Sequence, residues 1–256
     1  LQSIPNYRNK YETIIDIEPL QFGEMNEELY EMTSDEGVFI VTYGFDKNSN
    51  MIAFHDYLFS LSTIKKVLSM VITNYQSLLS NIFDLYDNNI CFFNLEPENI
   101  LFYKNRPIMI DFQQTFVTQT YHSTTSLTIF QDHFYSFIMK KTNLIYYPIE
   151  IHLFYHMIEK QVDILTYDMI ESIYDSFISQ LSILTFFSEA YSKKYRQVCY
   201  GFLEKYLNKD KTLILNEIIP FSYTWDNYSL SIIFIHLIGS FIRVSGIKET
   251  FLNDLL

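Results

Sequence analysis

Apolar residues recur along this chain with two different periods, which divide it into a front and a back part. Between Leu61 and Tyr86 they stand at positions 64, 68, 71, 72, 75, 78, 79, 82 and 83, the rhythm of a helix that packs through one side. Short runs rich in β-branched and aromatic residues flank this helix. They predict strands at Thr13–Ile17, Val38–Thr42, Ile90–Phe93, Ile100–Tyr103 and Ile108–Phe112.

Beyond residue 151 the pattern becomes helical. The predicted helices cover residues 151–160, 167–181, 184–207, 211–219 and 226–242, with Thr166 as a candidate N-cap. The last of them has an apolar core, SIIFIHLIGSFI, of roughly a dozen residues, which falls short of the ~20 that a membrane span needs. It predicts a buried core helix, so we expect no membrane span. A β-leaning front followed by a helical back indicates an α+β fold.

The composition is that of a folded chain with a sizeable core. Its 256 residues are 48% hydrophobic and 19% charged, enough for one large domain or two modest ones. The net charge is −12, and the chain contains no run of Lys and Arg. Because nucleic-acid binding requires clustered cations to neutralise phosphates, we expect no nucleic-acid partner.

The cysteines and the first residues indicate the compartment. Cys91 and Cys199 form neither a disulfide framework nor a CxxC motif, which is typical of packed thiols in a reducing compartment. The start of the chain has no apolar signal core, so we expect a cytoplasmic protein that is not secreted. The 21 Tyr and 23 Phe beside only 6 Gly and 6 Pro indicate an AT-rich genome, such as that of a large DNA virus, a protist or a parasitic bacterium.

The most informative stretch begins at Phe92 and reads FFNLEPENILFYKNRPIMIDF. It resembles the catalytic core of protein kinases, in which a loop H-R-D-L-K-P-E-N precedes a hairpin that ends in D-F-G. Asp111 and Phe112 stand where the metal-binding Asp-Phe of that pattern would be. The matching loop positions are Leu95, Pro97, Glu98, Asn99, Ile100 and Leu101.

Two later segments extend the resemblance. The run Tyr147-Pro-Ile-Glu is similar to the A-P-E element of kinases, which implies that Glu150 locks the activation segment to the helical lobe. Asp226-Asn-Tyr-Ser resembles the start of the kinase central helix. This implies that Asp226 caps that helix and holds the backbone of the catalytic loop. Phe92 and Phe112 would belong to a hydrophobic spine.

The resemblance implies a protein-kinase-like architecture with two unequal lobes. Residues 1–50 would form a truncated, β-rich N-terminal lobe and hinge, and residues 51–256 a large, mostly helical C-terminal lobe. A helical insert at about 151–219 stands where ordinary kinases have a short connection. Kinase-like proteins of giant and other large DNA viruses have similarly divergent helical halves, which agrees with the AT-rich composition.

The positions that carry phosphoryl transfer are degenerate. Asn94 replaces the catalytic Asp and removes a basic site, whereas Glu96 replaces the loop Lys and reverses its charge. Gln113 replaces the glycine of D-F-G, and the chain contains neither G-x-G-x-x-G nor V-A-I-K. Asn99 and Asp111 remain, which in the family hold magnesium. They could equally bond the loop and cap a turn.

We therefore expect a pseudokinase that needs no cofactor. It would act by binding another protein or as a structural component, for example of a virus particle, in the host cytoplasm or in the virion. The alternative is a divergent active serine/threonine kinase that uses ATP and Mg²⁺ and receives its missing front lobe from upstream sequence or in trans. The insert, with aromatic residues between Tyr191 and Tyr206, offers a partner-binding face. His152 and His156 are a weak metal pair, more simply two histidines at a lobe surface.

Overall fold

The structure is a computed structural model, and it describes residues 4, 5, 7, 10, 11, 14–19, 39–43, 51–60, 64–118, 131, 134, 135, 137, 138, 141 and 144–245. Most of the predicted front lobe, residues 1–50, lies outside them. Over the described residues the protein is α+β, because helices predominate and the named strands pair antiparallel in small sheets.

Three small sheets are present among the described residues. Strand β1 (Ile14–Pro19) pairs with β2 (Phe39–Tyr43), and β4 (Ile90–Cys91) pairs with β7 (Phe116–Val117). The third sheet has the order β3-β5-β6. Its strands are β3 (Ile52–Ala53), β5 (Ile100–Tyr103) and β6 (Arg106–Met109).

Four of the five predicted strands begin or end elsewhere than expected, and the ends of β1 and β2 differ by only one or two residues. The other two differ for a visible backbone reason. The strand predicted at Ile90–Phe93 stops at Cys91, because Phe93 adopts a left-handed backbone with φ 64°. The strand predicted at Ile108–Phe112 begins at Arg106, because the turn before it is made by Lys104 and Asn105, both with positive φ.

The helices follow the predicted pattern closely in most places. Their bounds are α2 (Phe54–Phe59), α3 (Ile64–Asp87), α5 (Ile149–Glu159), α6 (Tyr167–Gln180), α7 (Glu189–Glu204), α8 (Lys211–Ile218) and α9 (Trp225–Ser245). Short 3₁₀ helices lie between these elements. Two follow strands, η3 (Pro97–Asn99) and η4 (Phe112–Gln114), and two connect helices, η6 (Ser182–Phe186) and η7 (Ile219–Thr224).

Two details of the helix prediction are wrong. The helix predicted over 184–207 is divided, because Ser188 is extended and its side chain accepts a hydrogen bond from the Tyr191 N–H, so that α7 begins at Glu189. Thr166 occupies the N-cap position of α6 as predicted, but its side chain makes no capping hydrogen bond.

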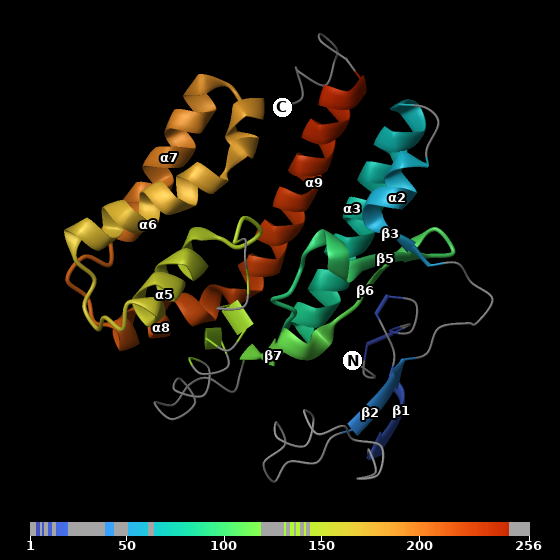
Figure 1. Cartoon of the computed structure of the whole chain (residues 1–256), viewed down its shortest axis with the longest axis horizontal. Helices are drawn as coiled ribbons and strands as arrows, with labels where there is room; N and C mark the ends of the chain where they lie inside the picture. The colour runs from blue at the N-terminus through green and yellow to red at the C-terminus, as the bar shows by residue number, and fades with distance from the viewer. Residues whose placement is uncertain are drawn as a thin grey trace, which may run out of the picture.

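Helix α9 separates two hydrophobic cores. Figure 1 shows it in the middle of the molecule, between α5 to α8 on one side and α3 with the β5–β6 hairpin on the other. Leu230 and Phe234 of α9 belong to the core on the α3 side, whereas Trp225 and Ile232 belong to the core on the α5 side. We call these the α3 core and the α5 core.

The described residues of each core come from several parts of the chain. Ile4 and Tyr11, which lie before residue 50, are buried in the α3 core with Phe54. Residues of the predicted insert, such as Phe177 and Leu203, share the α5 core with Phe93, Tyr147 and Trp225. The segment 151–219 is therefore part of the body of the molecule rather than an appendage.

Both cysteines are free and buried. Within the described residues, none of the helices combines the length and the apolar character that crossing a bilayer requires.

Candidate functional site

The loop that follows β4 is hydrogen-bonded to the start of α9. The two carboxylate oxygens of Asp226 accept hydrogen bonds from the backbone N–H groups of Phe92 and Phe93, each at 2.8 Å. Phe92 is buried in the α3 core and Phe93 in the α5 core, so Asp226 fixes the chain where it passes from one to the other. It also supports the left-handed backbone of Phe93.

Asp226 makes the loop bonds expected of it but does not cap α9. It is the second residue of the helix, both of its oxygens are used by the loop, and η7 leads directly into α9. The carboxyl group is 3% exposed, and burial raises its pKa to about 6, although the two N–H donors favour the charged form. Burial likewise raises the pKa of the neighbouring Cys91 thiol.

Asn94 joins Asn99 and Asp111, the two positions at which the resemblance predicts magnesium ligands. Its amide nitrogen donates to the Asp111 carboxylate at 2.7 Å, and its backbone oxygen accepts from the Asn99 side chain at 2.8 Å. Asp111 follows β6 with a left-handed backbone, φ 62°, and the Ile110 N–H donates to the Asn99 backbone oxygen. Asn94 is itself only 1% exposed.

Glu96 does not stand as an uncompensated negative charge. The Lys141 ammonium lies 2.7 Å from its carboxylate and 2.9 Å from the Asn94 amide oxygen. The Tyr147 hydroxyl also donates to Glu96, at 3.2 Å. Burial, with the neighbouring Glu96, raises the pKa of Tyr147. The repulsion expected from the charge reversal at Glu96 is therefore offset by Lys141, which the sequence reasoning missed.

Phe92 and Phe112 form part of an aromatic column. Their ring centroids are 4.8 Å apart in an edge-to-face arrangement. The Tyr11 ring also packs edge-to-face against Phe112, with the two centroids 5.6 Å apart. The Tyr11 hydroxyl donates to the backbone oxygen of Asn81 in α3. The N-terminal segment thus holds Phe112, and with it the backbone that leads from Asp111.

Phe93, at the position of the kinase Arg, is an aromatic hub instead of a charged residue. It is 4% exposed. Its ring lies within 6 Å of five other aromatic rings, those of Phe116, Phe134, Phe137, Tyr147 and Trp225. An arginine side chain would have no place among them without a partner for its charge.

Glu150 and His152 depart from their expected settings. No basic side chain among the described residues pairs with Glu150, and burial raises the pKa of its carboxyl. Burial raises the pKa of the Cys199 thiol, and the negative charge of Glu150 adds to this rise. His152 lies in the interior rather than at the surface: it is 4% exposed, its Nε2 is 3.0 Å from the Leu144 oxygen, and burial lowers its pKa to about 4.

The loop, the hairpin and the segment before α5 thus bring Asn94, Glu96, Asn99 and Asp111 together around Lys141. The described part of the chain contains no group of three or more His, Cys, Asp or Glu side chains placed to hold a metal ion. A scan against protein-family models finds no match, and a search of curated proteins finds no significant relative.

Proposed function

We propose that the chain is a protein-kinase-like module that does not transfer phosphate and acts by binding another protein. The support for kinase-likeness is the spacing of the P-E-N, I-D-F and Y-P-I-E elements, together with the bonds from Asp226 to Phe92 and Phe93. The amino-acid composition, which indicates an AT-rich genome, favours a large DNA virus as the source. We therefore place the module in the host cytoplasm or in the particle.

The observation that carries the inactive assignment is the burial of Asn94 among its hydrogen-bond partners. Both atoms of its amide are used, one by Asp111 and the other by Lys141, and the residue is 1% exposed. A substrate hydroxyl has no route to a group so enclosed, and a neutral amide has no basic site to take its proton. Catalysis by a positioned base would be lost on both counts.

The bridge from Glu96 to Lys141 supports a structural role for the loop. It joins the loop to the segment before α5 through a partly buried ion pair, and the Tyr147 hydroxyl adds a second bond. These bonds favour a rigid loop, whereas catalysis often requires a loop that moves when the substrate binds.

The second candidate function is a divergent serine/threonine kinase, and Lys141 is the observation that favours it. Its ammonium supplies a positive charge beside Asn94, at a loop where Glu96 alone would repel phosphate. Under this alternative Asn99 and Asp111 would hold Mg²⁺ and ATP would donate the phosphate.

A phosphate-transfer assay separates the two functions. The full chain is incubated with radiolabelled ATP, Mg²⁺ or Mn²⁺ and generic protein substrates, beside Asp111→Ala and the matched control Asp175→Ala, which removes an exposed acid on α6. We expect incorporation no higher than that of Asp111→Ala. Transfer that disappears in Asp111→Ala and persists in Asp175→Ala would establish the kinase instead.

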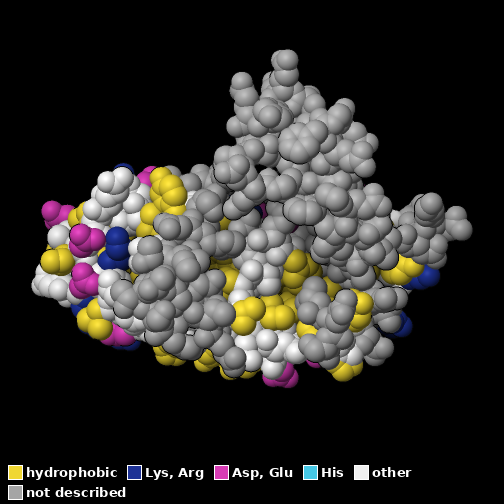
Figure 2. Space-filling model, turned by 90° about the horizontal axis from the view of Figure 1, so that it is seen from below, with side chains coloured by type: hydrophobic (Ala, Val, Ile, Leu, Met, Phe, Trp, Pro, Cys, Tyr) yellow, Lys and Arg dark blue, Asp and Glu magenta, His cyan; other side chains and the backbone are white. Residues whose placement is uncertain are grey.

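The binding half of the proposal places the partner on α6 and α7. Tyr167, Tyr191 and Val198 on these helices are 52%, 48% and 62% exposed. In Figure 2 hydrophobic side chains lie among acidic and basic ones at the left end of the molecule, a mixture common in protein–protein interfaces. Interface energy concentrates in aromatic anchors, so these tyrosines are the first candidates.

The partner face is tested with the native complex. Tagged wild-type chain and the double variant Tyr167→Ala/Tyr191→Ala are purified from the source cells, beside Phe221→Ala, which truncates a residue that is 54% exposed on η7. We expect the tyrosine variant, but not Phe221→Ala, to lose its co-purifying protein while its melting temperature stays the same. Equal recovery from all three chains would place the partner elsewhere.

A further inference from the structure

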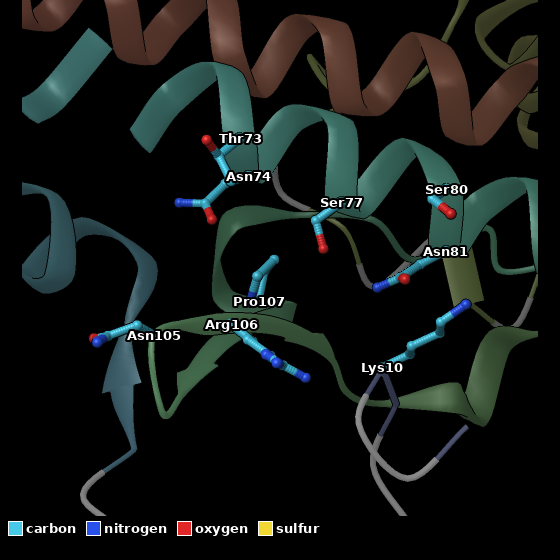
Figure 3. Close-up of a pocket in the computed structure, with 9 residues that line it drawn as sticks. All are labelled: Lys10, Thr73, Asn74, Ser77, Ser80, Asn81, Asn105, Arg106 and Pro107. Carbon is cyan, nitrogen blue, oxygen red and sulfur yellow. The ribbon is translucent and has the colours of Figure 1, made fainter. Parts of the chain in front are cut away.

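A polar groove lies between α3 and the β5–β6 hairpin. Its volume is about 490 Å³, within the range of roughly 300–1,000 Å³ typical of ligand sites. Figure 3 shows Asn74, Ser77 and Asn81 on the side of α3 that faces the hairpin, with the Lys10 side chain rising toward Asn81 from below, whereas the Arg106 side chain extends from the hairpin away from α3.

Two buried amides in this groove have no hydrogen-bond partner. Asn74 and Asn81 are 4% and 2% exposed, and the side-chain nitrogen of each makes no hydrogen bond. A buried donor without an acceptor destabilises a fold, and native structures contain few of them. Two such donors on one helix face, both lining one groove, point to an acceptor that enters from outside.

The charges of the groove select the kind of acceptor. Arg106 is exposed, and no carboxylate among the described residues forms an ion pair with it, whereas Lys10 is paired with Asp84. The groups of the lining that call for an acceptor are therefore the two unpartnered amide nitrogens and the Arg106 guanidinium, beside hydroxyl groups that can donate or accept. They match carbonyl oxygens together with one carboxylate.

The spacing of the two amides selects the shape of the ligand. Seven residues separate Asn74 from Asn81, which corresponds to about 10.5 Å along the axis of α3. In the polyproline II conformation, which is extended and has three residues per turn, three residues of peptide rise about 9.3 Å. Carbonyl groups three residues apart on such a chain lie on the same side and can therefore meet both amides at once.

We propose that this groove binds an extended acidic peptide segment of another protein. Two main-chain carbonyl oxygens of the peptide accept from the Asn74 and Asn81 amides, and a Glu or Asp side chain pairs with Arg106. The groove can bind such a segment whether or not the loop transfers phosphate, so its test and that of the proposed function fail independently.

The test is a titration of the full chain, labelled with ¹⁵N in its side-chain amides, with a capped hexapeptide of alternating glutamate and alanine. We expect the Asn74 and Asn81 amide signals to shift on binding, and Arg106→Gln to weaken the affinity at least tenfold. The matched control is Lys104→Gln, which removes one positive charge from the same turn without lining the groove, and it should change the affinity less than twofold. Asn81→Leu should abolish the binding while the far-UV circular dichroism is preserved.

Three results would overturn the proposal. The first is an absence of amide shifts at millimolar peptide. The second is equal weakening by Arg106→Gln and Lys104→Gln, which would indicate attraction by net charge only. The third is an equal response to acetate, to inorganic phosphate or to the same peptide with glutamine in place of glutamate, which would identify a site for small anions or an unselective one.

Discussion

Asn94 joins three segments of the chain, because it bonds Asp111 after the hairpin, Lys141 before α5 and, through its backbone, Asn99. We expect Asn94→Ala to lower the free energy of unfolding by about 1–3 kcal/mol, since it leaves a carboxylate and an ammonium with fewer partners in a closed site. Chemical denaturation followed by circular dichroism measures the change.

Glu98→Ala is the matched control for Asn94→Ala. Glu98 is an exposed residue of the same loop, so its truncation should change the stability by less than about 0.5 kcal/mol. Equal effects of the two substitutions would contradict the bonding role of Asn94.

His152 should make stability fall in acid. Burial lowers its pKa from 6.5 to about 4, so between these values the unfolded chain binds a proton that the folded chain does not. Stability is therefore lost as the pH falls from 7 toward 4, by on the order of 3 kcal/mol for this residue. Asp226, whose pKa burial raises to about 6, acts in the opposite direction over an overlapping range.

Comparison with His152→Gln isolates the histidine from Asp226. Glutamine retains a donor for the Leu144 oxygen but does not titrate. Urea midpoints measured between pH 7 and 4.5 should fall more steeply for the wild type than for the variant. Parallel profiles would mean that His152 is as protonated in the folded chain as in the unfolded one.

At the scale of the element, Gly239 of α9 allows the Phe186 ring of η6 to pack closely against the helix. A Cβ built on Gly239 would lie 2.0 Å from a ring carbon of Phe186, so only glycine lets this ring pack on the helix. We expect Gly239→Ala to destabilise the protein by about 1–3 kcal/mol through overpacking. Thermal unfolding measures the difference.

Gly201→Ala is the control for this prediction. Gly201 is exposed within α7, and a Cβ there has no neighbour within 4 Å. Because alanine favours a helix over glycine by about 1 kcal/mol, this variant should melt at a higher temperature than the wild type. If both alanine variants are stabilised, the Phe186 ring can move aside without loss.

Periodicity predicted the helices because each buries a stripe of apolar residues, but it could not predict what else lies in the stripe. Asn74 and Asn81 are buried on α3 although their side chains are polar, and both line the groove beside the hairpin. The division of the helix predicted over 184–207 was missed for a similar reason. The capping bond of Ser188 outweighs a continuous apolar rhythm.

At the scale of the molecule, motif spacing and long-range contacts were not equally predictable. The hydrogen bonds between Asp226 and the loop at Phe92 and Phe93 could be expected, because both the loop and the start of α9 carry a recognisable sequence motif. The contact between Glu96 and Lys141 joins residues 45 positions apart, and nothing near Lys141 distinguishes it from other lysines. Only the packing of the segment before α5 brings it to the loop.

The helices of the predicted insert should unfold together with the loop, because both lie in the α5 core. Trp225 is the single tryptophan, is 2% exposed and packs against Phe93. Its fluorescence reports on the loop, whereas far-UV circular dichroism reports mainly on the helices. We expect the two signals to give the same urea midpoint. A fluorescence transition that precedes the loss of helix would mean that α5 to α8 hold their structure without the loop, and the segment 151–219 would then be a separate folding unit.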